Sequence, residues 1–279
     1  MKDYVAGIYR VERPEAPLPL IFDSPHSGRD YPDDFNYVCP FEMLQKAEDN
    51  YVDELFENVP AAGGTLLTAL FPRTYIDVNR AATDIDPDML DGTWPDAVRP
   101  TARSRAGTGL IRRKLRMHTP VYDRKLSIKD IKQRIDNFYK PYHDTLAGLL
   151  AEAHSAHGQV WHINCHSMPA TQPDFCIGDY DGRSCDRDFT YDLRDFLKNL
   201  GYNVALNHPY KGVEILRRYG APAQGRHSIQ MEISKALYWN SESGKKMKNY
   251  NELKENLEKM VSFCAAWVTD RNAIDLAAD

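Results

Sequence analysis

Residues 18–28, LPLIFDSPHSG, begin with a short apolar run and continue at once into aspartate, serine, proline, histidine and glycine. An apolar run of this length before turn-forming residues is typical of a buried strand. A second segment of the same kind, VWHINCHS, occupies residues 160–167, with a predicted strand at 160–164. Both segments therefore predict a buried strand whose carboxyl end carries a histidine, His26 in the first and His166 in the second.

Outward from these two strands, the pattern alternates between strands and helices. Helical spacing predicts helices at 41–59, from a Ser127–Asp130 capping box onward, at 189–200 and at about 251–268. Further strands are predicted at 65–70, 74–78, 203–206 and 228–233. This alternation predicts an α/β fold with a mixed, mostly parallel central sheet and helices on both faces. No linker or repeat marks a boundary, so we expect a single domain over residues 1–279.

Residues 82–125 have no clear period and are rich in aspartate, arginine, proline and glycine. A loop this long is uncommon unless it is functional or carries short elements of its own. Its most cationic part, RRKLR at 112–116, is predicted to be a solvated loop rather than a phosphate site.

Composition excludes several classes of protein. The net charge of -5 leaves no basic face for nucleic acid. The first 14 residues are polar, and no stretch approaches the roughly 20 apolar residues that span a bilayer, so we expect no membrane partner. Five cysteines without a C-x-x-C pair indicate reduced thiols and a cytoplasmic location. Because the G-x-S-x-G, P-loop and G-x-G-x-x-G motifs are missing, serine hydrolases, nucleotide hydrolases and dinucleotide enzymes are disfavoured.

The two strand-end histidines are the strongest candidates for chemistry. In sheets of this type, ligands gather at the carboxyl ends of the strands. Two imidazoles and one carboxylate form a common catalytic zinc site and leave one position open for water. A histidine beside a strand can equally be a hydrogen-bonded structural residue. The residues alone leave both interpretations open.

The predicted helix at 41–59 offers four acidic residues as a third ligand. A helical wheel places Asp53 almost opposite the apolar stripe, Asp49 nearer its border and Glu48 inside it. This favours Asp49 over Asp53 only weakly, and Glu48 and Glu54 also remain open.

Three further residues lie near predicted strand ends. Arg80, next to Asn79, offers a fork of donors suited to a carboxylate, although a salt bridge within the fold is an equal alternative. Glu232 lies on an apolar strand, where burial is costly without a metal, water or a cation nearby. A general base that takes a proton from an activated water meets that need.

Several motifs, taken in order, resemble the N-formylglutamate amidohydrolase family. They are PHSG at 25–28, IDVNR at 76–80, CHS at 165–167, PDF at 173–175 with Gly178, DGRSCD at 181–186, KG at 211–212, RRYG at 217–220 and HSIQME at 227–232. The resemblance runs from near residue 18 to the final helix. The family is similar in fold to zinc carboxypeptidases and aspartoacylase, which implies a zinc-exopeptidase-like (phosphorylase/hydrolase-like) sheet.

The resemblance also implies a zinc site. Its ligands would be His26, His166 and an acidic residue, for which Asp49 is the matching position. Carboxypeptidases carry a glutamate three residues after the first histidine, but this chain has Arg29 there, so the third ligand comes from elsewhere. Cobalt, manganese and iron also suit such a ligand set.

Roles in catalysis and substrate binding follow from the same resemblance. Glu232 would be the general base, and Arg80 with Asn79 would face the substrate or the oxyanion. The remaining substrate-binding candidates are Lys211, Arg217 and His227.

The function implied is hydrolysis of N-formyl-L-glutamate to formate and L-glutamate, within histidine degradation. One alternative is the same metal chemistry on another N-acyl amino acid or a small peptide. An alternative of another class is a non-catalytic homologue that binds an acidic metabolite. The presence of both histidines together with Glu232 favours the enzyme, because a silent homologue is free to lose one of them. The expected partner is thus a small N-acyl acidic amino acid.

Overall fold

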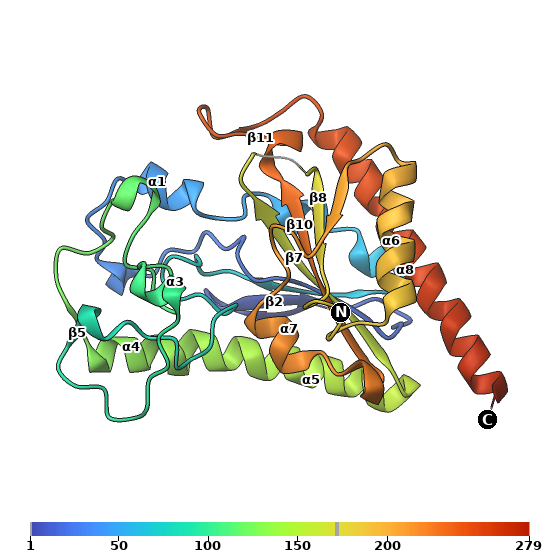
Figure 1. Ribbon diagram of the computed structural model, residues 1–279, viewed down its shortest axis with the longest axis horizontal. Coiled ribbons are helices and arrows are strands. Elements are labelled where there is room, and N and C mark those ends of the chain that lie inside the picture. Colours follow the sequence, from blue (N-terminus) through green and yellow to red (C-terminus); the bar gives the residue numbers. More distant parts are fainter. Residues whose placement is uncertain (1, 171–172, 279) are drawn as a thin grey trace.

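The computed structural model describes residues 2–170 and 173–278 and centres on an eight-stranded sheet (Figure 1). In spatial order, the strands are β1 (Lys2–Val5), β2 (Tyr9–Glu12), β4 (Thr65–Ala69), β3 (Leu20–Ser24), β7 (Val160–Met168), β10 (Arg226–Ser234), β8 (Phe175–Gly178) and β9 (Val204–Leu206). The four central strands β4, β3, β7 and β10 are parallel, whereas β1 with β2, β2 with β4 and β8 with β10 pair antiparallel. The edge strand β9 runs parallel to β8. The predicted mixed α/β sheet with a parallel centre is confirmed.

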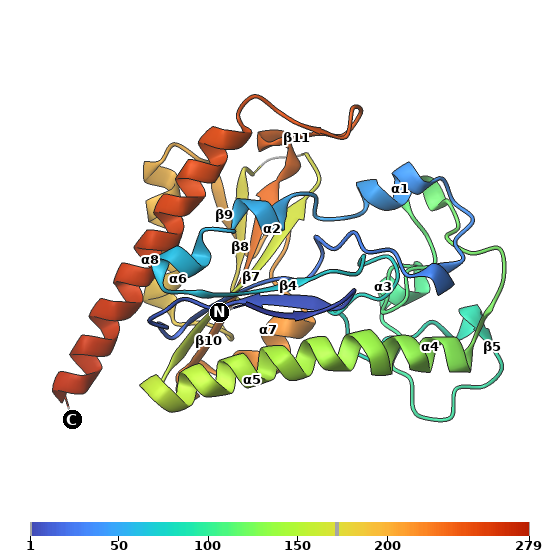
Figure 2. The same cartoon turned by 180° about the vertical axis from the view of Figure 1, so that it is seen from behind.

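Helices cover both faces of this sheet, as Figures 1 and 2 show from opposite sides. The α-helices of the described ranges are α1 (Phe41–Lys46), α2 (Val52–Leu55), α3 (Ala102–Arg105), α4 (Ile128–Arg134), α5 (Lys140–His157), α6 (Arg187–Asn199), α7 (Glu214–Tyr219) and α8 (Tyr250–Ala278), of which α1 and α3 lie beside the sheet. A π-helical turn at Ile135–Tyr139 joins α4 to α5 into one long rod. Within the described ranges, no helix has the length and apolar character needed to cross a membrane.

Two apolar clusters, one on each face, hold the helices to the sheet. Alternate residues of β3 divide between them: Ile21 packs in the cluster that contains Leu146 of α5, and Phe22 packs in the cluster that contains Leu257 of α8. All of these side chains are buried. Each contributes roughly 1.5–3 kcal/mol through burial.

Strands β7 and β10 place two predicted site residues side by side. Their parallel register pairs Glu232 with His166 and Gln230 with Asn164. Ile163 and Met231 belong to the apolar cluster beneath α8, so the intervening polar residues project from the opposite face. The register therefore brings His166 and Glu232 together at the same end of the sheet.

The predicted continuous helix at 41–59 is wrong, because the chain leaves the helix after α1 and forms only the short α2 before Pro60. Between the two, the backbone N–H of Asp49 donates to the carbonyl of His26 at 3.0 Å, and Ser27 Oγ donates to the carbonyl of Asp49 at 3.0 Å. Tyr51 then adopts a left-handed conformation, with φ of 61°. Asp49 therefore lies in a break that is fastened to the segment after β3, rather than on a helix face.

The predicted strand at 74–78 is also wrong. The segment forms turns, in which Tyr75 N–H donates to the Pro72 carbonyl at 2.9 Å and Arg80 N–H donates to the Asp77 carbonyl at 3.1 Å. Asp77 N–H donates instead to the carbonyl of Leu110, at 2.8 Å. These local bonds and the bond to the following loop replace the ladder of a strand.

The loop at 82–125 carries short elements of its own, as expected. β5 (Leu90–Asp91) pairs with β6 (Leu126–Ser127), and α3 lies between them in sequence. Another small pair, β11 (Trp239–Asn240) with β12 (Lys245–Lys246), lies before α8. The predicted cap at the start of α4 is present, since Ser127 Oγ accepts a hydrogen bond from Asp130 N–H at 3.1 Å.

Candidate active site

A cavity of about 1080 Å³ lies at the carboxyl ends of β3, β7 and β10. Its wall includes His26, which follows β3, together with His166 of β7 and Glu232 of β10. Ligand sites in sheets with parallel centres are expected at this position. The cavity therefore coincides with the site that the strand-end residues predicted.

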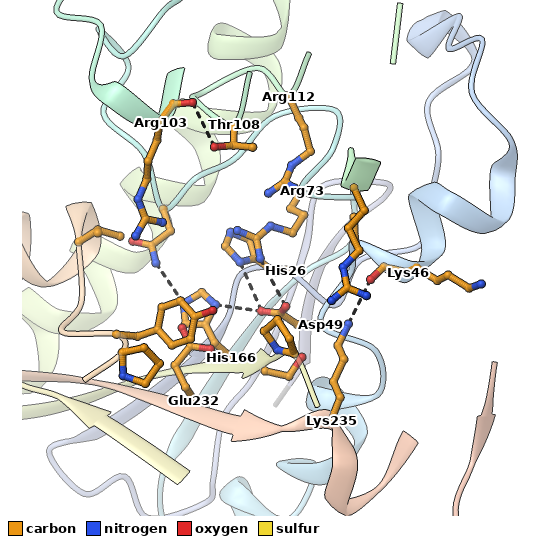
Figure 3. Close-up of a pocket in the computed structure, with 18 of the residues that line it drawn as sticks. His26, Lys46, Asp49, Arg73, Arg103, Thr108, Arg112, His166, Glu232 and Lys235 are labelled. Carbon is orange, nitrogen blue, oxygen red and sulfur yellow. Dashed lines mark hydrogen bonds and ion pairs between the residues drawn. The ribbon is translucent and has the colours of Figure 1, made fainter. Parts of the chain in front are cut away.

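His26, Asp49 and His166 converge in the wall of this cavity, and all three side chains are buried (Figure 3). Asp49 Oδ2 lies 3.0 Å from His166 Nδ1 and 3.4 Å from His26 Nδ1. One potential ligand atom from each residue falls within 4.8 Å of the other two. The group could hold a metal ion.

The partners of the far ring nitrogens assign the protons of both histidines. His26 Nε2 lies 2.8 Å from Asp77 Oδ1, which can only accept. His166 Nε2 lies 2.6 Å from Asn164 Oδ1, which faces the ring because Asn164 Nδ2 donates to Asp23 at 2.7 Å, and 3.1 Å from Asn79 Nδ2. The nearer oxygen acceptors favour a proton on each Nε2, and in that tautomer each Nδ1 is a potential metal ligand beside Asp49.

This arrangement fits a divalent cation. His26 Nδ1 is buried and has no hydrogen-bond partner among the described residues. Burial acts to raise the pKa of Asp49, but the charge of Arg73, with the two imidazoles, lowers the pKa well below its usual range. An ionised carboxylate and two imidazole nitrogens within 4.8 Å of one another form a ligand set that zinc prefers. Carboxylate–histidine contacts such as Asp77–His26 commonly orient metal ligands.

The structure brings Asp49, rather than its three acidic competitors, to the histidines. The side chains of Glu48, Asp53 and Glu54 contact other residues, namely Tyr31, Arg29 and Lys246, respectively. Side-chain periodicity misjudged this region because it assumed a continuous helix. The break at residues 47–51 decides which acid reaches the cavity.

Glu232 combines burial with a proton affinity suited to acid–base chemistry. Gln230 Nε2 donates to its Oε1 at 2.7 Å. Burial raises the pKa of Glu232 to about 7, the charge of Asp49 adds to this rise, and His166 and Arg73 act against it. A carboxylate that titrates near neutral pH can take up a proton and release it again.

Arg73 is a site residue that the sequence reasoning missed. Its guanidinium lies 3.0 Å from Asp77 Oδ2 and 3.4 Å from Asp49 Oδ1, and it lines the cavity. Arg73 follows the carboxyl end of β4, a central parallel strand. The strand-end rule that selected the histidines was the signal that could have found it.

Asn79 and Arg80 both line the cavity, but only Arg80 has N–H donors left for a ligand. Asn79 Oδ1 accepts from the N–H of Ile215 at 3.1 Å, and its Nδ2 donates to Gln230 Oε1 at 3.2 Å. Arg80 donates to the carbonyls of Thr108 and Asn79 at 3.3 and 2.8 Å. Asn79 thus ties the cavity wall together, whereas the Arg80 guanidinium keeps its charge without an acidic partner within 4 Å among the described residues.

The structure places the other three predicted substrate-binding residues differently. Lys211 lines the cavity but pairs with Asp181 at 2.8 Å. Arg217 is not among the residues that line the cavity and forms a bidentate ion pair with Glu214 at 2.8 and 2.7 Å. His227 is likewise not among them and stacks on Trp161, with ring centroids 3.8 Å apart. The cavity therefore brings together His26, Asp49, His166, Glu232, Arg80, Asn79 and Lys211, but not Arg217 or His227.

An α/β sheet that presents a buried His–Asp–His group and an adjacent glutamate at its carboxyl edge combines a group that could hold a metal ion with a proton acceptor, an arrangement suited to hydrolysis. The sequence model of N-formylglutamate amidohydrolase matches residues 18–239. The chain therefore belongs to the N-formylglutamate amidohydrolase family, and both the family and the amidohydrolase class predicted from the sequence are confirmed.

Individual relatives agree with this assignment. The chain is 27% identical over 237 residues to an N-formylglutamate deformylase from Pseudomonas putida, covering 79% of this chain and 82% of the relative. It is 40% identical to an N-formylglutamate amidohydrolase from Ralstonia eutropha JMP134, whose crystal structure superposes with a TM-score of 0.92 over 95% of this chain and 99% of that chain. A gene product of Agrobacterium tumefaciens, 17% identical with a TM-score of 0.64 over 98% and 96% of the two chains, shares the fold.

Proposed function

We propose that this chain hydrolyses the formyl amide of N-formyl-L-glutamate, releasing formate and L-glutamate, with a divalent ion held by His26, Asp49 and His166. The observation that carries the proposal is the convergence of two buried imidazoles and one buried carboxylate beside Glu232. Membership of the family supports the substrate, since the relatives from P. putida and R. eutropha carry names for this activity. The same reaction is a step of histidine degradation, as the sequence resemblance implies.

Zinc is the ion that we propose, because two imidazole nitrogens and one carboxylate oxygen are a common zinc set with a position left for water. When bound, such an ion supplies Lewis-acid activation of water and of the amide carbonyl. Cobalt, manganese and iron suit the same ligands and are distinguished by elemental analysis. The five cysteines are buried free thiols, which supports a cytoplasmic location as part of this proposal.

Glu232 moves the proton in this mechanism. Its carboxylate takes a proton from the attacking water and then delivers it to the departing amine of glutamate. With a pKa near 7, the group is ionised in a substantial fraction of molecules at neutral pH and returns the proton readily. Gln230 holds one carboxylate oxygen and thereby fixes the direction of the side chain.

Arg73 and Arg80 supply positive charge for the oxyanion that forms at the amide carbon. Asp49 and Asp77 hold the Arg73 guanidinium in place before substrate arrives, so little reorganisation is needed. Loss of one donor of this kind usually costs roughly 100- to 1,000-fold in kcat.

The experiment that tests the proposal combines elemental analysis with a formate-release assay on purified protein. We expect about one divalent ion per chain, turnover of N-formyl-L-glutamate, and loss of both in His26→Ala and His166→Ala. His157→Ala, at an exposed position on α5, is the matched control and should keep both properties. Full metal retention in either site variant would remove that histidine from the site. Equal kcat/KM for N-formylglutamate and N-formylmethionine would overturn the substrate but leave the metal hydrolase standing.

A further inference from the structure

The cavity is strongly cationic although the chain as a whole is acidic. Its lining contains eight lysines and arginines but only two acidic residues, Asp49 and Glu232, whereas the chain carries a net charge of -5. Like charges gathered around a partly enclosed space repel one another unless an anion neutralises them. The charges that have no acidic partner therefore indicate where an anionic ligand binds.

Several of these cations are already engaged. Arg73 pairs with Asp49 and Asp77, and Lys211 pairs with Asp181. Lys235 donates to the carbonyl of Glu48 and, at 3.0 Å, to Asn50 Oδ1. The charges or donors of these three residues are used within the protein. The arginines of the 82–125 loop are the next candidates for binding an anion.

Arg112 forms no ion pair within 4 Å with an acidic side chain among the described residues, although the charges of Asp77 and Asp49 act on it from farther away. Its side chain lines the cavity, and Figure 3 shows it reaching from the loop toward Arg73 and the His26–Asp49–His166 group. Its Nε is buried without a hydrogen-bond partner among the described residues. Burial, followed by repulsion from Arg73, lowers the pKa of Arg112 to about 9. The accessible part of this half-buried side chain faces the cavity, where a ligand could relieve both penalties.

The loop holds Arg112 in a fixed position. Leu110 N–H donates to the Asp84 carbonyl at 3.1 Å. The backbone of Arg112 forms an isolated antiparallel β-bridge with that of Thr108. Ile111 is buried in the apolar cluster beside α4 and α5. Because the backbone is fixed in this way, the loop itself need not be ordered when Arg112 binds an anion.

We propose that Arg112 binds one carboxylate of the substrate through its guanidinium and makes the site select against analogues in which that carboxylate is an amide. This inference rests on the proposed function, because it concerns the same cavity. Guanidinium and carboxylate match as two parallel charge-assisted hydrogen bonds, which a neutral amide does not reproduce. Arg103, from the same loop, lines the adjoining wall and adds to the positive field.

The test compares Arg112→Met with the matched control Arg113→Met. Arg113 is the next residue, pairs with Asp86 at 2.6 Å and is not among the residues found to line the cavity. Three substrates are used: N-formyl-L-glutamate, N-formyl-L-glutamine and the α-amide of N-formyl-L-glutamate. For N-formylglutamate we expect Arg112→Met to lower kcat/KM by about 10- to 150-fold, the range for a hydrogen bond to a charged group.

The two amides identify the carboxylate. The loss caused by Arg112→Met should vanish for the amide that lacks the bound carboxylate and persist for the other, while Arg113→Met should affect all three substrates equally and little. An equal loss on all three substrates in Arg112→Met, or no loss on any, would overturn the inference.

A binding experiment separates this inference from the proposed function. Glutarate, a dicarboxylate without an amide, should raise the unfolding temperature of the wild type and of Arg113→Met more than that of Arg112→Met. Pentanoate, with one carboxylate, serves as the control ligand. If the wild type released no formate but glutarate still distinguished the two variants, the proposed reaction would fail and the carboxylate site would stand. Equal glutarate shifts in both variants would overturn the carboxylate site itself.

Discussion

The two faces of strands β7 and β10 differ completely, although alternate residues of the same two segments form them. On one face, Ile163, Ile229 and Met231 pack against α6 and α8 and are fully buried. On the other, His162 and Asn164 are buried just as deeply but are hydrogen-bonded. The apolar face stabilises the fold through burial. The polar face orients side chains, because each buried polar group is hydrogen-bonded to its neighbour.

Asp23 is the centre of the polar face. Its carboxylate accepts hydrogen bonds from Tyr142 at 2.7 Å, His162 at 2.9 Å and Asn164 at 2.7 Å. Burial acts to raise the pKa of Asp23, but these donors, led by His162, lower it. The chain of contacts from Asp23 through Asn164 to His166 shows how a buried charge can orient the proposed metal ligand His166. The following substitutions separate the roles of the two faces.

The largest effect is expected from Glu232→Gln, on the polar face. The amide keeps the shape but cannot take up a proton, so kcat should fall by roughly 100- to 10,000-fold while metal content and unfolding temperature stay near wild type. Steady-state formate release measures this. A kcat within about tenfold of wild type would show that Glu232 is structural.

The pH profile sharpens the same prediction. Because the carboxylate is the proton acceptor, kcat/KM of the wild type should fall as acidification protonates Glu232. The pKa of about 7 places the midpoint there, or lower when a bound cation stabilises the ionised form. This acidic limb should be missing in Glu232→Gln.

Ile163→Ala tests the apolar face within the same strand. Removing this fully buried side chain should lower the free energy of unfolding by about 2–5 kcal/mol, measured by urea denaturation. Turnover per folded molecule should remain close to wild type, because the polar neighbours on the other face keep their partners. A large loss of kcat in protein that is still folded would mean that the two faces are not independent.

Asn164→Ala tests the orienting role of the polar face. The variant removes the acceptor that holds the His166 Nε2 proton, and metal affinity should fall by about 10- to 100-fold. Competition with a chelator measures this affinity on folded protein, with unfolding temperature as the check on structure. Unchanged affinity would show that Asn79 and the surrounding packing orient the ring without Asn164.

The smallest effect is expected from Arg217→Ala. This arginine forms an ion pair with Glu214 at the surface of α7, and such pairs contribute about 0–1 kcal/mol. KM for N-formylglutamate should therefore change by less than about threefold. A strong rise in KM would restore Arg217 as a substrate-binding residue, as the sequence resemblance implied.

Local pattern predicted the parts of the site that belong to strands. His26, His166 and Glu232 could be found because an apolar run that ends in polar residues shows where a parallel strand delivers its side chains. Asp49 was only weakly favoured, since its position depends on hydrogen bonds to His26 and Ser27, which are more than 20 residues away in the sequence. A helical wheel contains no information about such contacts.

The arginines of the site show the same limit. The sequence predicted a solvated loop at 112–116, which is wrong for Arg112 because Leu110 and Ile111 are buried and draw the chain against the cavity. Arg217, in contrast, lies in a family motif that implied substrate binding, but in the structure it pairs with Glu214, three residues earlier. Charge in a sequence predicts that a partner exists, and only the packing of distant segments decides which partner it is.

The attachment of the 82–125 loop has a consequence for enzyme engineering. Two of its anchoring contacts, from Asp77 N–H to the Leu110 carbonyl and from Leu110 N–H to the Asp84 carbonyl, join main-chain atoms, and the buried Leu110 and Ile111 side chains point away from the positions to be varied. Any non-proline side chain is compatible with such bonds. Libraries that randomise the cavity-facing positions of the loop, Arg103 and Arg112 among them, can therefore explore new acyl amino acids while the strands that carry His166 and Glu232 stay unchanged.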